Sequence, residues 1–207
     1  MARPSVIDAG PVLGRVPSTV LFDLDGTLSD SAGGILASLR HAFASNGLPV
    51  LDAQAARDLL GPPFHQTLPP LVGEQRTAAV LAAFRAHQDA GARLQTRLFS
   101  GIRSLLDGLR DVGVRMAVAT SKRDGAAHQV VEHLGIGGYF ETVCGEQPDG
   151  PRASKAAVVA EVLSRLADPD PRTVLMVGDR AQDVLGARAH SVACLGDGWG
   201  YGNPGEL

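Results

Sequence analysis

Short apolar runs alternate with segments of helical periodicity over much of this 207-residue chain. The first clear run, Val20 to Phe22, is apolar at every position and leads directly into Asp23. Such a run is typical of a buried parallel strand that opens into a loop at its carboxyl end. From residue 101 onward, helices are expected over 102–112, 124–134, 154–166 and 181–190, and strands over 114–119, 142–144, 173–177 and 192–195. This order predicts an α/β fold, with a parallel sheet flanked by helices on both faces.

The stretch from residue 31 to residue 97 has a different pattern, because helical segments follow one another there without a convincing strand. Helices are expected over 30–46, 51–60, 65–71 and 74–90, separated by proline-containing breaks. We therefore predict an inserted all-helical cap over 31–97. The sheet core is expected to comprise 19–30 and 98–207, and residues 1–18 to form an N-terminal leader.

Two carboxylates follow the first predicted strand, Asp23 and Asp25. Side chains two residues apart on an extended chain point the same way, so both are expected to face one site. Like charges this close need a partner, and a hard cation such as Mg²⁺ suits oxygen ligands. One carboxylate is then available as a nucleophile and the other for proton transfer. The competing interpretation is a simple turn, since Asp25-Gly26 is a common turn pair.

Polar residues also stand where later strands end, at the sheet edge at which open α/β sheets bind ligands. Thr120 and Ser121 follow one strand and offer a hydroxyl and turn amides to a phosphate oxygen. Asp179 and Asp183 follow another, as candidate metal ligands. Lys155 opens a helix between them and is expected to offset negative charge. Each residue alone is as typical of a helix cap or turn, so their shared location carries the prediction.

Taken in this order, the motifs resemble those of the haloacid dehalogenase superfamily of phosphatases. The resemblance covers residues 19–207, and its most specific part is Phe22-Asp23-Leu24-Asp25-Gly26-Thr27-Leu28. The resemblance implies a Rossmann-like core in which Asp23 forms an aspartyl-phosphate and Asp25 transfers protons. Thr120 and Lys155 correspond to the second and third motifs. The implied Mg²⁺ ligands are Asp23, the backbone carbonyl of Asp25, and Asp179, with Asp183 in support.

The segment around Asp149-Gly150 and the tail at 199–202 are similar to the phosphoglycolate phosphatase-like group. This resemblance implies a small phosphorylated metabolite as substrate, with phosphoglycolate as the leading candidate. Nucleotidase, pyrophosphatase and phosphosugar mutase activities, and a non-catalytic phosphate-binding module, are the alternatives. The candidate substrate-binding residues are Gly61, Pro62, Pro63, Phe64, Ser121 and Arg152.

The chain departs from that group's pattern at three places. Gly33-Gly34 stands where a bulkier turn is usual, which predicts a looser hinge between cap and core. Glu146-Gln147-Pro148 replaces a smaller, serine-containing stretch. The end at Glu206-Leu207 corresponds to a truncation or to the loss of a dispensable tail. His65 is placed to meet a substrate without a catalytic role, and Arg180 is either a helix-start residue or an anion contact.

Composition narrows the class of protein. Charged residues make up 20% of the chain and the net charge is -3. The chain therefore lacks the basic character of a nucleic-acid-binding protein. The two cysteines have no metal-ligand spacing, and we expect a reducing, cytoplasmic location. No signal peptide or membrane span is recognised. We expect a monomer or a homodimer.

Overall fold

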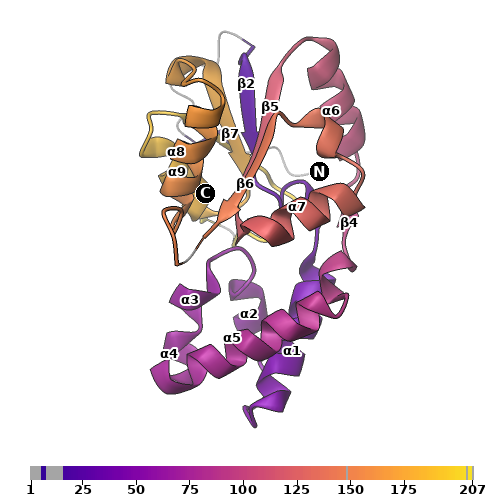
Figure 1. Ribbon diagram of the computed structural model, residues 1–207, viewed down its shortest axis with the longest axis vertical. Helices are drawn as coiled ribbons and strands as arrows, with labels where there is room; N and C mark the ends of the chain where they lie inside the picture. The colour runs from indigo at the N-terminus through magenta and orange to yellow at the C-terminus, as the bar shows by residue number, and fades with distance from the viewer. Residues whose placement is uncertain (1–5, 8–15, 148, 204, 207) are drawn as a thin grey trace.

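The structure is a computed structural model that describes residues 6–7, 16–147, 149–203 and 205–206. Its central feature is a six-stranded sheet in the order β1-β8-β7-β2-β5-β6 (Figure 1). The strands are β1 (Val6–Ile7), β2 (Thr19–Phe22), β5 (Arg115–Arg123), β6 (Thr142–Glu146), β7 (Val174–Gly178) and β8 (Ala193–Gly196). Strands β2 and β5 to β8 are parallel, whereas β1 pairs antiparallel with β8. The predicted α/β fold with a parallel sheet is confirmed, and part of the predicted leader contributes an edge strand.

Helices cover both faces of the sheet, as the alternation of elements predicted. One face packs against α6 (Ile102–Asp111) and α7 (Asp124–His133), and the other packs against α8 (Lys155–Arg165) and α9 (Ala181–Arg188). In β2, Val20 and Phe22 belong to the first apolar cluster and Leu21 to the second. The strand is apolar throughout because successive side chains point to opposite faces and both faces are buried.

The inserted helices form a separate unit beyond the carboxyl edge of the sheet (Figure 1). They are α1 (Ala32–Ser45), α2 (Ala53–Asp58), α3 (Phe64–Thr67), α4 (Pro69–Val72) and α5 (Glu74–Asp89). A third apolar cluster, built from Leu39, Phe43, Leu68 and Val80 among others, holds them together. We refer to this helical insertion as the cap.

Two elements of the cap differ from the prediction. The single helix expected over 65–71 is divided into α3 and α4, because Pro69 has no amide hydrogen to continue the hydrogen bonding and instead begins a new helix. A two-residue strand, β4 (Arg97–Leu98), pairs antiparallel with β3 (Ser29–Asp30) where the cap joins the core. The stretch predicted to lack strands therefore ends in a short paired hinge.

Gly34 has a packing role in this region. A Cβ atom at Gly34 would lie 2.3 Å from the carbonyl oxygen of Ala92, so only glycine lets α1 approach that backbone. The carbonyl of Gly34 accepts a hydrogen bond from the buried Gln88 side chain (3.1 Å), which also donates to Ser38 (2.8 Å). Gly34 thus brings α1 and α5 together within the cap, and the looser hinge between cap and core stays a prediction.

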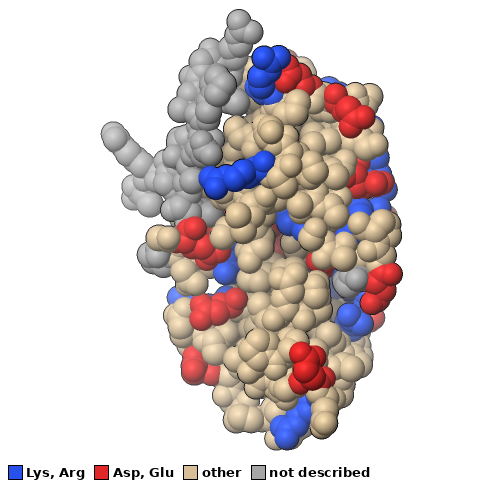
Figure 2. Space-filling view, turned by 90° about the vertical axis from the view of Figure 1, so that its left-hand side faces the viewer, with Lys and Arg blue, Asp and Glu red and all other residues tan. Residues whose placement is uncertain are grey.

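The surface in Figure 2 mixes acidic and basic side chains, and no broad patch of one sign covers that face. Among the described helices, none is both long enough and apolar enough to span a membrane.

Candidate active site

The predicted catalytic residues meet at the carboxyl edge of the sheet because their strands are neighbours there. β2 lies between β7 and β5, and Asp23 directly follows β2, with its amide donating to the carbonyl of Val177 in β7 (2.9 Å). Thr120 lies in β5, and Asp179 directly follows β7. The pairing of β2 with both neighbours therefore brings residues more than 150 positions apart to one site.

Lys155 binds two carboxylates at the bottom of this site. Its Nζ lies 2.8 Å from Oδ1 of Asp23 and 2.6 Å from Oδ1 of Asp183, and all three side chains are buried. Ser154 begins helix α8 by accepting a hydrogen bond from the amide of Ala157 (3.2 Å), which makes Lys155 the first helical residue. Burial opposes the ammonium charge, but Asp183 and Asp23 together raise the pKa of Lys155 above its usual range. Lys155 is therefore a fixed positive charge beside Asp23.

Asp179 completes a cluster of three buried carboxylates that fits a divalent cation. Oxygen atoms of Asp23, Asp179 and Asp183 lie within 4.8 Å of one another. One oxygen of Asp179 accepts a hydrogen bond from the amide of Tyr201 (2.6 Å), whereas Oδ1 is buried and has no hydrogen-bond partner among the described residues. Burial, together with the charges of Asp23 and Asp183, raises the pKa of Asp179 to about 8. Three carboxylates against the single ammonium of Lys155 leave excess negative charge, and a cation with oxygen ligands removes it.

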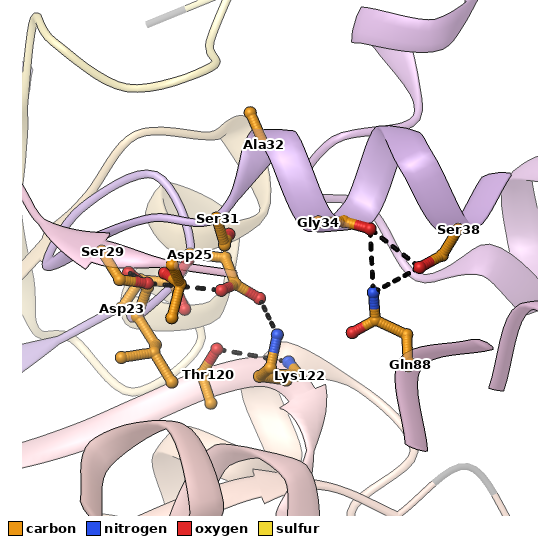
Figure 3. Close-up of polar contacts among 12 residues, drawn as sticks. Asp23, Asp25, Ser29, Ser31, Ala32, Gly34, Ser38, Gln88, Thr120 and Lys122 are labelled. Carbon is orange, nitrogen blue, oxygen red and sulfur yellow. Dashed lines mark hydrogen bonds and ion pairs between the residues drawn. The ribbon is translucent and has the colours of Figure 1, made fainter. Parts of the chain in front are cut away.

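Asp25 is held apart from this cluster. Its Oδ2 lies 2.7 Å from Nζ of Lys122, and its Oδ1 accepts a weaker hydrogen bond from Ser29 (3.4 Å). Figure 3 shows Asp25 and Lys122 pointing toward one another from the two sides of the site. Asp25 therefore lines the same pocket as Asp23, while its carboxylate is not part of the three-carboxylate cluster.

The hydroxyl-bearing residues Thr120 and Ser121 also face the site. Thr120 is buried, and its Oγ1 accepts a hydrogen bond from the amide of Lys122 (3.2 Å, Figure 3). Thr120, Ser121 and Lys122 line the same pocket as Asp23 and Asp25. Donors to a phosphate oxygen are thus available beside the carboxylates.

The cap forms the other wall of this pocket. The candidate substrate-binding residues Gly61, Pro62, Pro63 and Phe64 all line it, and so does His65. The ring of Phe64 packs edge-on against that of Phe84, with the ring centres 4.7 Å apart. The pocket therefore combines a polar floor from the core with an apolar wall from the cap.

Arg152 has a different environment from the one the sequence predicted. It is buried, with its guanidinium 2.8 Å from Oδ1 of Asp124 and donating to the carbonyl of Gly145 (3.0 Å). Arg152 is absent from the residues that line the pocket. Its contacts hold the start of α7 against the end of β6.

Arg180 and Tyr201 join the core to the cap. Arg180 begins α9, is 2.7 Å from the carboxylate of Glu206, and donates to the carbonyl of Leu60 in the cap. The phenol oxygen of Tyr201 accepts hydrogen bonds from the amides of Ser31 (2.7 Å) and Ala32 (3.0 Å), at the start of α1. The amide of the same Tyr201 holds Asp179, so one residue contacts both the carboxylate cluster and the cap.

Sequence reasoning missed several pocket residues. Lys122 directly follows the Thr120-Ser121 motif, so its position in the sequence could have indicated a contact with Asp23 or Asp25. Arg85 had no comparable signal, because it reaches the pocket from helix α5 of the cap, whereas Glu146 ends strand β6. Tyr201 does not line the pocket but contacts Asp179 from the tail.

The model of the haloacid dehalogenase-like hydrolase family matches residues 20–196 of the chain. The chain is 46% identical over 190 residues to the tyrosine-protein kinase PtkA of Mycobacterium tuberculosis, covering 91% of this chain and 65% of that protein. It is 34% identical over 198 residues to a 5'-nucleotidase of Pseudomonas aeruginosa, covering 93% and 87% of the two chains. It is 30% identical over 197 residues to phosphoglycolate phosphatase 1 of the same organism, covering 90% and 71%.

The fold is also similar to that of a solved haloacid dehalogenase-like hydrolase from Streptococcus pneumoniae. The TM-score is 0.86 at 28% identity, with 93% of this chain and 90% of the other covered. The similarity thus extends over the sheet and the helical insertion together.

Proposed function

Because the chain belongs to the haloacid dehalogenase-like hydrolase family, we propose that it is a Mg²⁺-dependent phosphatase that hydrolyses a small phosphate monoester through an aspartyl-phosphate on Asp23. The observation that carries this proposal is the buried contact of Lys155 with Asp23, beside two further carboxylates. A carboxylate approaches an anionic phosphate only where nearby positive charge offsets their repulsion.

Asp23 is proposed as the nucleophile. Its amide is tied to β7 and its carboxylate to Lys155, so the side chain has a fixed position at the pocket floor. Attack of its free oxygen on phosphorus expels the alcohol of the ester and leaves the phosphoryl group on Asp23. Thr120 and Ser121 are placed to donate hydrogen bonds to the phosphoryl oxygens.

Asp25 is proposed to move the protons. It lines the pocket close to Asp23, where it protonates the leaving oxygen and then takes a proton from the water that hydrolyses the aspartyl-phosphate. Lys122 keeps the Asp25 carboxylate turned toward the pocket through their 2.7 Å contact.

The metal would be held by Asp23, Asp179 and the backbone carbonyl of Asp25, with Asp183 in support. When bound, Mg²⁺ supplies positive charge for the phosphoryl oxygens. The unpartnered buried oxygen of Asp179 supports this assignment, because a buried carboxylate oxygen without a donor is costly unless a cation meets it.

The relatives support phosphate monoesters as the substrate class but differ within it. Their names include a phosphoglycolate phosphatase and a 5'-nucleotidase, which match the leading candidate and one alternative from the sequence. Phosphosugar mutase and pyrophosphatase activities use the same carboxylate chemistry. The paired Asp23 and Asp25 speak against a non-catalytic phosphate-binding module.

A second candidate is transfer of the phosphoryl group to a tyrosine hydroxyl. It is favoured by the 46% identity to the kinase PtkA, of whose length this chain spans 65%. Incubation with γ-labelled ATP and a tyrosine-containing peptide, followed by phosphotyrosine detection, tests it. Labelled phosphotyrosine would favour the kinase, and release of free phosphate alone would favour the phosphatase.

The phosphatase proposal is tested with Asp23→Asn. The variant is expected to lower turnover by roughly four orders of magnitude, since the nucleophile is lost while the side-chain shape is kept. Free phosphate release from a panel of phosphorylated metabolites with Mg²⁺ is the measurement, and circular dichroism verifies the fold. Undiminished turnover in Asp23→Asn would refute the mechanism.

A further inference from the structure

Two arginines line the pocket without an acidic partner. Arg85 lies on α5 of the cap and is half-buried, and Arg123 ends β5 in the core. Both belong to the pocket lining. Within the described residues, neither forms an ion pair or a hydrogen bond through its side chain.

The other charged groups of the pocket floor are already matched. Asp23 is paired with Lys155 and Asp25 with Lys122. In the cap wall, Arg93 has an ion pair with Asp89. The charge left over at the outer part of the pocket is therefore that of the two arginines.

Arg85 and Arg123 act on each other across the junction of cap and core. Burial and the positive charge of Arg123 both lower the pKa of Arg85, and Asp149 opposes them. Both residues line one pocket, Arg85 from the cap and Arg123 from the core, and the repulsion between two like charges there disfavours the closed arrangement of cap on core. An anion between the two guanidiniums reverses that effect, and guanidinium groups bind carboxylate and phosphate oxygens in a bidentate manner.

Glu146 does not neutralise this pair. It is the register partner of Arg123 between β5 and β6, and it lines the same pocket. Its Oε1 is buried and makes no hydrogen bond within the described chain, and burial raises its pKa to about 7. Glu146 thus forms no ion pair with Arg123 within the described residues, and its burial favours the neutral carboxyl.

We infer that the substrate carries a second anionic group, a carboxylate or a second phosphate, that Arg85 and Arg123 bind from the cap and core sides while the phosphoryl group lies at Asp23. This inference rests on the proposed phosphatase function and narrows its substrate class. Phosphoglycolate-like esters and bisphosphates meet the requirement, whereas phosphate esters with neutral alcohols do not.

The test compares esters that differ in the second charge. The probes are 2-phosphoglycolate, a propanediol bisphosphate and ethyl phosphate, with wild type, Arg85→Met and the control Arg76→Met, which removes an exposed arginine from the same helix. Arg85→Met is expected to lower kcat/KM about 10- to 100-fold for the preferred doubly anionic ester. For ethyl phosphate the change is expected to stay within about threefold, and Arg76→Met is expected to match wild type. Preference between the first two probes identifies the carboxylate or the phosphate.

Wild-type hydrolysis of ethyl phosphate as efficient as that of both charged esters would overturn the inference and leave the phosphatase proposal standing. An equal loss on all three esters in Arg85→Met would do the same.

A binding measurement keeps the inference testable if no ester is hydrolysed, which would count against the phosphatase proposal. Phosphonoacetate and methylphosphonate differ by one carboxylate, and titration calorimetry compares their affinities. Phosphonoacetate is expected to bind wild type at least about tenfold more tightly, and Arg85→Met is expected to abolish the difference. Equal affinities in wild type would refute the second anion site.

Discussion

The core and cap sides of the pocket are built in opposite ways. On the core side, Asp23, Asp183 and Lys155 are buried, and each contacts a partner from another element. On the cap side, Phe64 and Arg85 are partly exposed, and the contact of Phe64 with Phe84 is apolar and without directional hydrogen bonds. Directional contacts from several elements fix the positions of groups, whereas apolar packing tolerates substitution. Under the proposed function, the core side is thus suited to one reaction and the cap side to a choice among substrates.

Glycines on the core side let the backbone lie very close to the carboxylates of Asp179 and Asp183. A Cβ atom at Gly26 or Gly200 would lie 2.3 Å from an atom of Asp179, and one at Gly178 would lie 2.3 Å from Asp183. Such distances are far below van der Waals contact, so these backbones approach the carboxylates only as glycine. On the cap side, Gly61 (φ 104°) approaches the aliphatic part of the buried Arg180 side chain and not a carboxylate.

The substitution Lys155→Met is expected to have the largest effect on the core side of the pocket. Methionine keeps the length of the side chain but leaves Asp23 and Asp183 unpaired in a buried site, which is expected to cost about 3–5 kcal/mol of unfolding free energy. Phosphate release is expected to fall by roughly three orders of magnitude, because the charge beside the nucleophile is lost. Urea unfolding and a phosphate assay measure the two effects.

Lys122→Met is the matched control, since it removes the ammonium that contacts Asp25. That pair is less enclosed and Asp25 still faces the pocket, so a loss of only about 1 kcal/mol is expected. Equal destabilisation by the two substitutions would contradict the expectation that the more deeply buried of the two core-side ion pairs contributes more to stability.

The substitution Tyr201→Phe tests the contact between the core side and the cap side of the site. Phenylalanine keeps the ring beside Phe99 and the amide that donates to Asp179, but it loses the phenol oxygen that accepts from Ser31 and Ala32. A loss of about 1–2 kcal/mol is expected, because two amides at the start of α1 lose their acceptor. KM is expected to rise several-fold more than kcat falls, since the cap is displaced while the core carboxylates stay in place.

Steady-state kinetics and urea unfolding on the same preparation check this prediction. A fall in kcat with an unchanged KM would show that Tyr201 acts on Asp179 alone and that the cap is positioned independently of it.

The same contrast explains what the sequence could predict. Asp23, Thr120 and Asp179 each directly end a strand or lie near its end, so the order of elements along the chain was enough to bring them together. Arg85 reaches the pocket through packing of the cap, and Tyr201 reaches Asp179 through packing of the tail, which no local pattern encodes. Arg152 shows the converse, because the resemblance made it a candidate substrate contact, while its side chain contacts Asp124.

The smallest expected effect is that of Glu146→Gln, which changes how the stability of the protein depends on pH. Burial raises the pKa of Glu146 from 4.5 to about 7, so between these values the folded protein keeps a proton that the unfolded chain has lost. This group therefore contributes a stability loss that grows as the pH rises from about 4.5 to about 7. Glutamine cannot ionise and removes that loss.

Urea midpoints of Glu146→Gln and wild type are expected to be close at pH 5 and to separate in favour of the variant by about 1 kcal/mol at pH 8, a value reduced from the full shift because the pocket is reached by solvent. The core carboxylates are common to both proteins, so their titration cancels in the difference. A constant difference across this pH range would mean that Glu146 is charged in the folded protein. Glu146 would then be a competing anion for Arg123, and the pocket would lose the excess positive charge on which the second anion site rests.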